Sequence, residues 1–354
     1  AEVPTNKADV LREVDMIEEI LRIYGFNNVP IPSRVTTSIA IRDGLDASQV
    51  RNLISDHLAA QGFNEMMALS LSESRYYQDK EHLVAPVQLV YINNTSNVHL
   101  DIMRPHMVYS GLEAILRNQN RQEADLRLFE FGRTYSRDEE IFTEVNRLSI
   151  YLTGRRQSES WLAEDNLQLS YYSMKAYVTN IMNRLGISGF QQEAVDGSGV
   201  LAFGSRYFRG SRELVRFGRL QTALLKEMDI KGEVFYADFH WDNLFAAIPK
   251  KRVQFQELNK FPVMRRDLAL VVDNSVKFSD IAAIAAKAAK KLLSDTNLFD
   301  VYVNDDQLGA GKKSYAVSFI FEDTSRTLKI KEVDKVMQRI IQNCEQQLGA
   351  QIRR

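Results

Sequence analysis

Four carboxylates near the start of the chain have the spacing of a cation site: Asp9, Asp15, Glu18 and Glu19. The last three lie at positions i, i+3 and i+4 of a predicted helix, so they share one side of it. Carboxylates this close repel one another unless a cation lies among them, and oxygen ligands without His or Cys favour Mg²⁺ over zinc. The alternative is an acidic first helical turn that the helix dipole stabilises and nearby basic residues neutralise.

Asp300 and Tyr302 form a second candidate group. They lie in a segment where every second residue is apolar. The alternation predicts a strand in which Phe299, Val301 and Val303 face a core, while the open face carries Leu298, Asp300, Tyr302 and Asn304. An exposed ring can stack on an unpaired base, and a carboxylate can accept hydrogen bonds from the ring N–H and amino group of guanine. This pair therefore indicates a reader of single-stranded RNA. The alternative is a Tyr packed on a neighbouring domain beside a solvated Asp.

The elements that position this pair span residues 267–353. Residues 268–272 alternate as a strand, and we expect Ser279 to cap a helix whose apolar residues recur at helical spacing. Residues 299–303 and 315–321 alternate as two further strands, and residues 333–348 carry the apolar stripe of a second helix. A short last strand, 350–353, completes the order strand–helix–strand–strand–helix–strand. This order predicts a ferredoxin-like domain, a four-stranded antiparallel sheet with both helices on one face.

Basic residues near the ends of these strands can hold RNA phosphates without reading sequence. They are Arg265, Arg266, Lys312 and Lys313. The formal net charge of −1 argues against a strongly basic nucleic-acid-binding protein. A local basic patch is nevertheless sufficient for RNA, and a partner subunit can supply further charge.

The length of 354 residues and the hydrophobic content of 45% predict two or three domains. The mixture of helical and strand periods along the chain predicts the α+β class. Pro30 and Pro32 break the first helical pattern, so we place a domain boundary after residue 33. Residues 45–258 alternate helices and strands, and residues 66–71 are expected to form a buried strand. We find no apolar run long enough for a bilayer and no signal peptide, and the single cysteine fits a reducing cytoplasm.

Short motifs in three parts of the chain resemble one family. Residues 259–267, 298–302, 312–315, 319–323 and 326–328 resemble the C-terminal ferredoxin-fold anticodon-binding domain of bacterial phenylalanyl-tRNA synthetase β subunits. Residues 14–30 resemble the end of the family's DNA-binding-fold domain. Residues 100–106, 118–121 and 128–132 resemble its catalytic-like module, a relative of class II synthetase cores. The resemblance implies a fragment of a larger protein with three domains, 1–33, 45–258 and 260–354.

The resemblance also implies a function and partners. The chain would be a non-catalytic part of a ligase in which the α subunit uses ATP to attach phenylalanine to tRNA(Phe). Two α and two β chains would assemble in the cytoplasm, away from membranes, and share Mg²⁺ at Asp9, Asp15, Glu18 and Glu19. Asp300 and Tyr302 would read an anticodon that begins with guanine. The family's editing domain would lie upstream of Ala1, so we expect no editing by this chain.

The central region lacks part of what a working class II core needs. Such a core grips the phosphates of ATP with a strand arginine and with a Gly-rich strand that leads to a Glu-Arg pair. Arg104 is a candidate for the first, but residues 217–252 contain no Gly-rich strand followed by Glu-Arg. We therefore expect no adenylation site in this chain. Two other functions compete with the ligase subunit: a stand-alone RNA-binding or assembly module, and a complete enzyme with a Mg²⁺ site.

Overall fold

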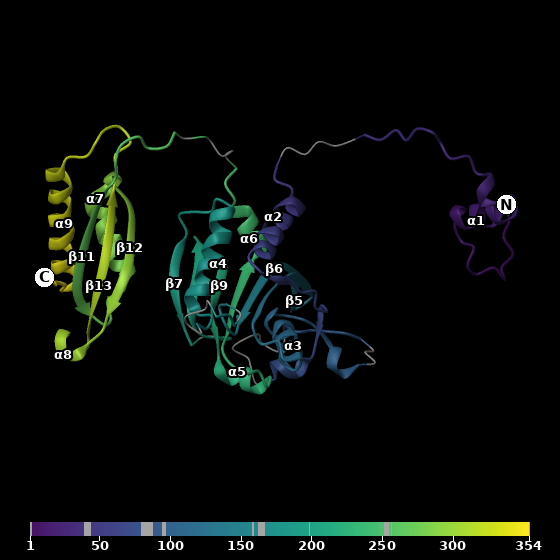
Figure 1. The fold of residues 1–354 in the computed structure, drawn as a ribbon. Helices are drawn as coiled ribbons and strands as arrows, with labels where there is room; N and C mark the ends of the chain where they lie inside the picture. Colours follow the sequence, from purple (N-terminus) through teal and green to yellow (C-terminus); the bar gives the residue numbers. More distant parts are fainter. Residues whose placement is uncertain are drawn as a thin grey trace. The chain divides into compact units, whose positions relative to one another are not determined.

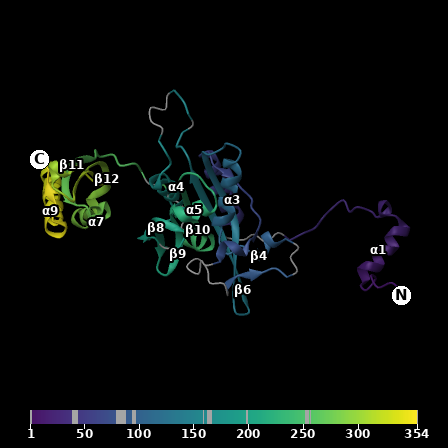
Figure 2. The same ribbon diagram turned by 90° about the horizontal axis from the view of Figure 1, so that it is seen from below.

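The computed structural model describes residues 2–38, 44–78, 88–93, 97–157, 159–161, 167–197, 199–250, 255 and 257–353. The chain divides into two compact units, Ala1–Lys250 and Lys251–Arg354 (Figure 1 and Figure 2). Both units combine helices with antiparallel sheet, which confirms the α+β class. Within the described ranges, no helix has the length and apolar content that a membrane span requires.

The first helix, α1 (Glu13–Tyr24), ends as predicted at Gly25. Gly25 has a φ of +89°, a conformation that glycine adopts without strain, and the short helix η1 (Phe26–Asn28) follows. At the other end of α1, the Asp15 carboxylate accepts hydrogen bonds from the backbone N–H groups of Leu11 and Arg12. No residue of α1 is buried.

A seven-stranded sheet forms the centre of the first unit, with the order β1-β5-β6-β10-β9-β8-β7. Only β1 (Asn64–Glu65) pairs in parallel with its neighbour. The antiparallel strands are β5 (Leu126–Asp138), β6 (Ile141–Thr153), β7 (Gln191–Asp196), β8 (Leu201–Arg209), β9 (Arg212–Leu220) and β10 (Val234–His240). A smaller sheet joins β2 (Leu71–Ser72), β4 (Ile102–Met103) and β3 (Val90–Tyr91). The predicted buried strand 66–71 is wrong, since Met67 and Leu69 are exposed.

Alternation along the long strands gives the large sheet two apolar faces. On one face, a core forms with helices α2 (Ala47–Ala60), α4 (Tyr171–Arg184) and α6 (Trp241–Ala247). On the other face, Tyr151 of β6 and Tyr236 of β10 belong to a second core with α3 (Val108–Gln119) and α5 (Thr222–Glu227). The sheet is therefore covered on both sides.

A line of polar residues crosses the second face of this sheet. Its members are direct cross-strand partners on six neighbouring strands, so they share one face: Glu130, Ser149, Asp238, Arg216, Arg206 and Glu193. We call this line the polar row. Ser149 and Glu130 lie at its buried end.

Arg104, the candidate phosphate-binding arginine, is held at this buried end. Its guanidinium Nη1 lies 3.0 Å from Glu130 Oε1, and both side chains are only 3% exposed. Arg104 Nε also donates to the carbonyl of Arg133, 2.9 Å away. Burial raises the pKa of Glu130, although the neighbouring Arg104 charge lowers it. Arg104 therefore serves as the counter-charge of a buried carboxylate.

The second unit has the predicted ferredoxin-like order of elements, with a sheet in the order β12-β13-β11-β14. The strands are β11 (Met264–Asp273), β12 (Leu293–Tyr302), β13 (Lys312–Phe321) and β14 (Gln351–Ile352). The helices α7 (Phe278–Ala289) and α9 (Ile330–Leu348) pack on one face with a shared core. Short helices η5 (Lys290–Leu292) and α8 (Asp305–Leu308) flank β12.

Two local predictions in this unit are corrected by the structure. Ser279 lies inside α7 instead of capping it, and the Asp280 carboxylate accepts the backbone N–H of Lys277 in that role. Val303 lies beyond the end of β12, which stops at Tyr302.

We predict that Arg104→Met lowers the free energy of unfolding of the first unit by about 3–5 kcal/mol at pH 7, because it leaves the buried Glu130 carboxylate without its counter-charge. A carboxyl group whose folded pKa is raised destabilises the fold increasingly as the pH rises above the ordinary pKa of that group. The loss should therefore shrink as the pH falls toward the ordinary range of a glutamate. Urea unfolding at pH 7 and pH 5, followed by the fluorescence of buried Trp241, measures both effects.

The double variant Arg104→Met/Glu130→Leu is the control, because it removes both charges and should recover most of the loss. Equal free energies of unfolding for Arg104→Met and the wild type at pH 7 would show that the fold does not need Arg104 to compensate the charge of Glu130.

Candidate nucleic-acid interface

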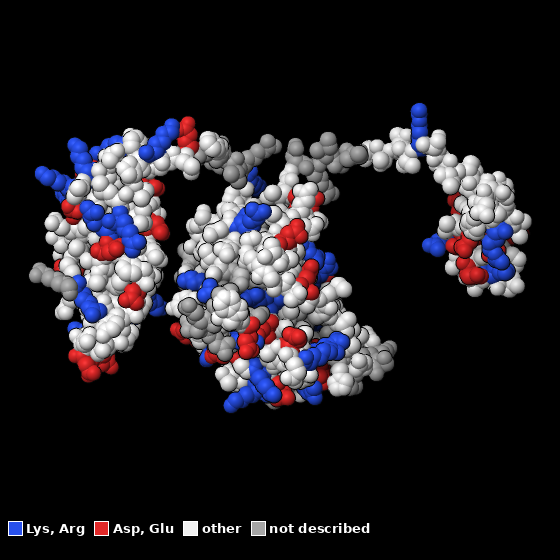
Figure 3. Space-filling model, in the orientation of Figure 1, with Lys and Arg blue, Asp and Glu red and all other residues white. Residues whose placement is uncertain are grey.

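One face of the four-stranded sheet is open, because α7 and α9 both cover the other. Along the inner strand β13, Tyr315, Val317 and Phe319 are buried in the helix-side core. The alternate residues therefore belong to the open face, and they are small: Ser314, Ala316 and Ser318. Side chains from neighbouring strands can lie across such a strand. In Figure 3 the visible side of this unit, at the left, carries Lys and Arg interspersed with Asp and Glu.

A β-bulge in β12 decides which side chains reach the open face. The register shifts between Leu298, which pairs with Val317, and Asp300, which pairs with Ala316. Leu298 therefore packs in the helix-side core, contrary to the prediction. Asp300 lies on the open face as predicted. Tyr302, which pairs with Ser314, lies on the same face.

The Tyr302 ring is covered by an arginine in this structure. The guanidinium carbon of Arg353 lies 4.6 Å from the ring centroid, and the Tyr302 hydroxyl donates to Gln307 Oε1, 2.8 Å away. Arg353 follows β14, and its N–H donates to the carbonyl of Ala269 on β11. The side chain thus crosses the open face to reach β12.

Phe299 and Arg265 form a second arginine–aromatic pair on the same face. The Phe299 ring was predicted to face the helices, but it is 50% exposed, with the Arg265 guanidinium carbon 5.5 Å from its centroid. Arg265 is fixed by Asp267, since its Nε donates to Asp267 Oδ1 at 2.8 Å. Asp300, in contrast, is exposed and makes no side-chain hydrogen bond or ion pair to any described residue. Its carboxylate is therefore free to accept donors from a ligand.

The four basic residues predicted to bind phosphate are split between the two faces. Arg265 pairs with Ile320, and Lys312 pairs with Asp273, both in the open-face register. Arg266 instead pairs with Phe319 and forms an ion pair of 3.3 Å with Asp334 of α9. Lys313 Nζ donates to the carbonyl of Asn274 at 2.8 Å and lies 4.8 Å from the Tyr315 ring centroid. Arg266 and Lys313 are thus already engaged on the helix side.

The four carboxylates of the predicted Mg²⁺ site do not converge. Asp15 is partly exposed, and its hydrogen bonds from the N–H groups of Arg12 and Leu11 lower the pKa of its carboxyl group. Glu19 is 3.0 Å from the guanidinium of Arg22, while Asp9 and Glu18 are exposed. No three metal-binding side chains gather anywhere in the part of the chain that the structure describes. These residues therefore do not form a complete ligand set by themselves.

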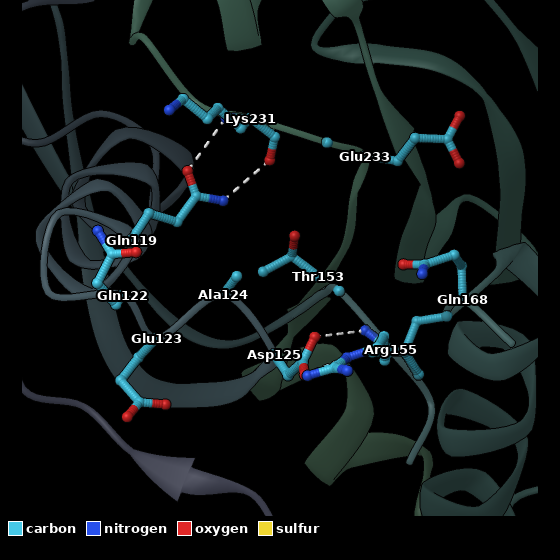
Figure 4. A pocket seen from close by; sticks show the side chains of 13 residues that line it. Gln119, Gln122, Glu123, Ala124, Asp125, Thr153, Arg155, Gln168, Lys231 and Glu233 are labelled. Atoms are coloured by element: carbon cyan, nitrogen blue, oxygen red, sulfur yellow. Dashed lines mark hydrogen bonds and ion pairs between the residues drawn. The ribbon is translucent and has the colours of Figure 1, made fainter. Parts of the chain in front are cut away.

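The large pocket of the first unit contains no set of catalytic groups among its described residues. It has a volume of about 850 Å³ and lies at the end of α3, beside the start of β5 and the end of β6 (Figure 4). Gln119 exchanges two hydrogen bonds with the backbone of Lys231, of 2.9 and 3.1 Å. Asp125 accepts from both the backbone and the side chain of Arg155. These polar groups satisfy one another and connect the ends of neighbouring elements.

Sequence reasoning missed Phe299 and Arg353 as members of the open face. The bulge that turns Phe299 toward this face has no signal in a regular alternation of apolar residues. Arg353 reaches Tyr302 only because β14 pairs with β11. In the sequence, the one sign of this role of Arg353 is that a basic residue stands at the end of the last predicted strand.

Three family models match successive parts of the chain. The model described as tRNA synthetase B5 domain matches residues 1–26, and that described as Phenylalanyl tRNA synthetase beta chain CLM domain matches residues 31–241. The model described as Ferredoxin-fold anticodon binding domain matches residues 259–353, the range that contains the open sheet face.

Curated relatives are similar over nearly the whole chain. The Phenylalanine–tRNA ligase beta subunit of Bacteroides fragilis is 39% identical, over 99% of this chain and 44% of the relative. The subunit of the same name from Clostridium tetani is 32% identical, over 99% of this chain and 43% of the relative. The chain thus spans less than half the length of these relatives. A solved pyrrolysyl tRNA synthetase of Desulfitobacterium hafniense is 15% identical, with a TM-score of 0.43, over 64% of this chain and 70% of that one.

The β-chain model alone covers residues 31–241, which is more than half of the sequence. The ferredoxin-fold match coincides with the second compact unit. The chain therefore belongs to the phenylalanyl-tRNA synthetase β-chain family.

Proposed function

We propose that this chain is the tRNA-binding and assembly part of a phenylalanine–tRNA ligase β subunit. In this function it supports the ATP-dependent attachment of phenylalanine to tRNA(Phe), which the α subunit catalyses. The observation that carries the proposal is the open sheet face, where Asp300 and Tyr302 lie on the same side of β12. An aromatic ring beside an unpaired carboxylate suits a splayed-out guanine, the first base of the phenylalanine anticodon.

The Arg353 guanidinium over Tyr302 is compatible with base stacking. A cation–π contact at an exposed site contributes about 0.5–1 kcal/mol, whereas stacking of a base on an aromatic side chain contributes about 1–3 kcal/mol. A base can therefore displace the guanidinium from the ring. The displaced Arg353 then remains beside the bound nucleotide, where its charge favours a phosphate.

We assign amino-acid activation to the α subunit. Arg104, the candidate for gripping ATP phosphates, neutralises the buried Glu130 instead. Releasing it to bind ATP would leave Glu130 buried and uncompensated, at a cost of several kcal/mol. In this proposal two α and two β chains form the cytoplasmic complex, and ATP binds to the α subunit.

Mg²⁺ at Asp9, Asp15, Glu18 and Glu19 is also part of the proposal, with the missing ligands supplied by the α subunit. The described carboxylates are exposed or partly exposed and do not converge, so this chain alone should bind Mg²⁺ weakly. Hard oxygen ligands remain the right chemistry for the ion.

The alternative function is a stand-alone RNA-binding or assembly module that uses the same open face without a ligase partner. Light scattering of the chain mixed with the α subunit and tRNA discriminates the two, because only a ligase subunit forms a stable complex with the α subunit. ATP–pyrophosphate exchange by the chain alone would reveal a complete enzyme, the third candidate.

We predict that Asp300→Asn reduces the discrimination of guanine from adenine at the first anticodon base. The amide keeps one acceptor but presents a donor to the guanine N–H groups, so the double acceptor is lost. Tyr302→Ala should weaken binding of tRNA(Phe) by about 1–3 kcal/mol through lost stacking. Binding of tRNAs with the first anticodon base varied, to the complex of this chain with the α subunit, measures both.

Tyr302→Phe is the matched control. It keeps the ring, loses only the hydrogen bond to Gln307, and should bind nearly as well as the wild type. Discrimination by Asp300→Asn equal to that of the wild type would remove Asp300 from the reading site.

We predict that Arg265→Ala and Lys312→Ala weaken the binding of all tRNAs alike. Each lost phosphate contact to a single strand should reduce the slope of log K against log salt by about 0.7. Arg266→Ala and Lys313→Ala are charge-matched controls on the helix side and should leave this slope unchanged. A salt titration of tRNA binding measures these slopes. Equal slopes for all four variants would contradict the proposal that only the open-face residues contact phosphates.

We predict that Glu18→Gln/Glu19→Gln raises the Mg²⁺ concentration needed for assembly with the α subunit, because neutral amides are weaker ligands for a hard cation. Glu13→Gln, on the same exposed helix, is the control. Sedimentation of the complex across a Mg²⁺ titration measures the effect. Unchanged assembly would show that the acids form only a solvated helix face.

A further inference from the structure

A second, smaller cavity lies over the middle of the polar row, at the start of α3. Its volume is about 280 Å³. Arg147, Tyr236 and Asp238 of the large sheet form its floor, and the apolar side chains of Val108, Val200 and Leu201 line it as well. Such a space suits a small metabolite.

Asp238 has weaker partners than the other acidic residues near this cavity. Glu130 has Arg104 at 3.0 Å, and Glu213 has Arg216 at 2.9 Å. The contact of Asp238 Oδ2 with Arg147 Nη1 is 3.5 Å long. Asp238 Oδ1 is buried and has no hydrogen-bond partner among the described residues. A buried carboxylate oxygen without a donor costs free energy, so Asp238 is held less well than Glu130 or Glu213.

Arg147 is the matching unsatisfied cation on the cavity floor. Its contacts are long, 3.4 Å from Nε to Thr134 Oγ1 and 3.5 Å from Nη1 to Asp238. Arg216, in contrast, donates from Nε and Nη2 to the carboxylate of Glu213. The side chains of Arg147 and Asp238 are 22% and 20% exposed, so solvent reaches both. An anionic group on a ligand would therefore bind at Arg147.

The cavity lining is electrically balanced, with Arg147 and Arg216 opposing Glu213 and Asp238. A ligand with a net charge would disturb this balance, whereas a zwitterion carries both charges without altering it. We propose that this cavity binds a small apolar α-amino acid, with its ammonium group at Asp238 and its carboxylate at Arg147. The amino-acid side chain then packs against Val108, Val200 and Leu201.

This site is separate from the open sheet face, so the inference does not depend on tRNA binding. It assigns to the β-chain sheet a binding site for a free amino acid, distinct from any activation step.

The test is isothermal titration calorimetry of the full chain with L-valine, L-leucine and L-phenylalanine. At least one should bind with a Kd of about 1 mM or tighter. The amide and the N-acetyl derivative of that amino acid keep only one charged group each. Both should bind at least tenfold more weakly. No binding by any of the three, or equal binding of the derivatives, would overturn the proposal.

Variants locate the site. Asp238→Asn and Arg147→Met should each weaken the binding at least tenfold, while circular dichroism confirms that they are folded. Asp229→Asn is the matched control, because it makes the same charge change at an exposed position. Its φ of +54° suits asparagine, so the fold should be unaffected. Full binding by a folded Asp238→Asn variant would contradict the assignment, and the derivative series on the wild-type chain stays decisive if a variant fails to fold.

Discussion

Residues that pair directly across an antiparallel sheet lie on the same face, and this constraint governs both units of the chain. In the first unit it lines up six polar residues from six strands in the polar row. In the second unit it places Asp300 and Tyr302 opposite the small residues Ala316 and Ser314 of β13. Small partners let side chains from neighbouring strands lie across β13, so Ser314 itself is buried. The same geometric rule therefore aligns a row of polar residues that is buried at one end in the first sheet, and sets Asp300 and Tyr302 side by side in the second.

Ion pairs within the first unit hold most of the acidic residues at or near the polar row. A buried charge requires a counter-charge within reach, and this applies to Glu130, whose side chain is only 3% exposed. Glu130 takes Arg104, and Glu213 takes Arg216. Arg104 is buried with its carboxylate, so binding another anion would cost this ion pair. Asp238 and Arg147 are the exception, since burial raises the pKa of Asp238 and their contact stays long. Incomplete pairing is what leaves this position able to bind a ligand.

On the open face, two arginine–aromatic contacts orient the rings of Phe299 and Tyr302. Arg265 of β11 lies over Phe299, and Arg353, which follows β14, lies over Tyr302. Exposed contacts of this kind are weak, so they orient the rings at a small cost to ligand binding. The helix side behaves differently, because Arg266 and Lys313 are engaged by Asp334 and by the backbone of Asn274. Positive charges that are adjacent in sequence thus have different contacts.

The sequence by itself determined the ferredoxin-like order, the end of α1 at Gly25 and the open-face position of Asp300 and Tyr302. These features depend on local periodicity and on single residues, which a sequence displays directly. Only the tertiary structure decided that Leu298 turns inward and that Phe299 and Arg353 join the open face, because a bulge and the pairing of β14 are set by partners distant in sequence. The capture of Arg104 by Glu130 and the underpaired Asp238 are of the same kind. The physical reason is that charge pairing and strand register are properties of contacts between strands, and no single segment contains both partners.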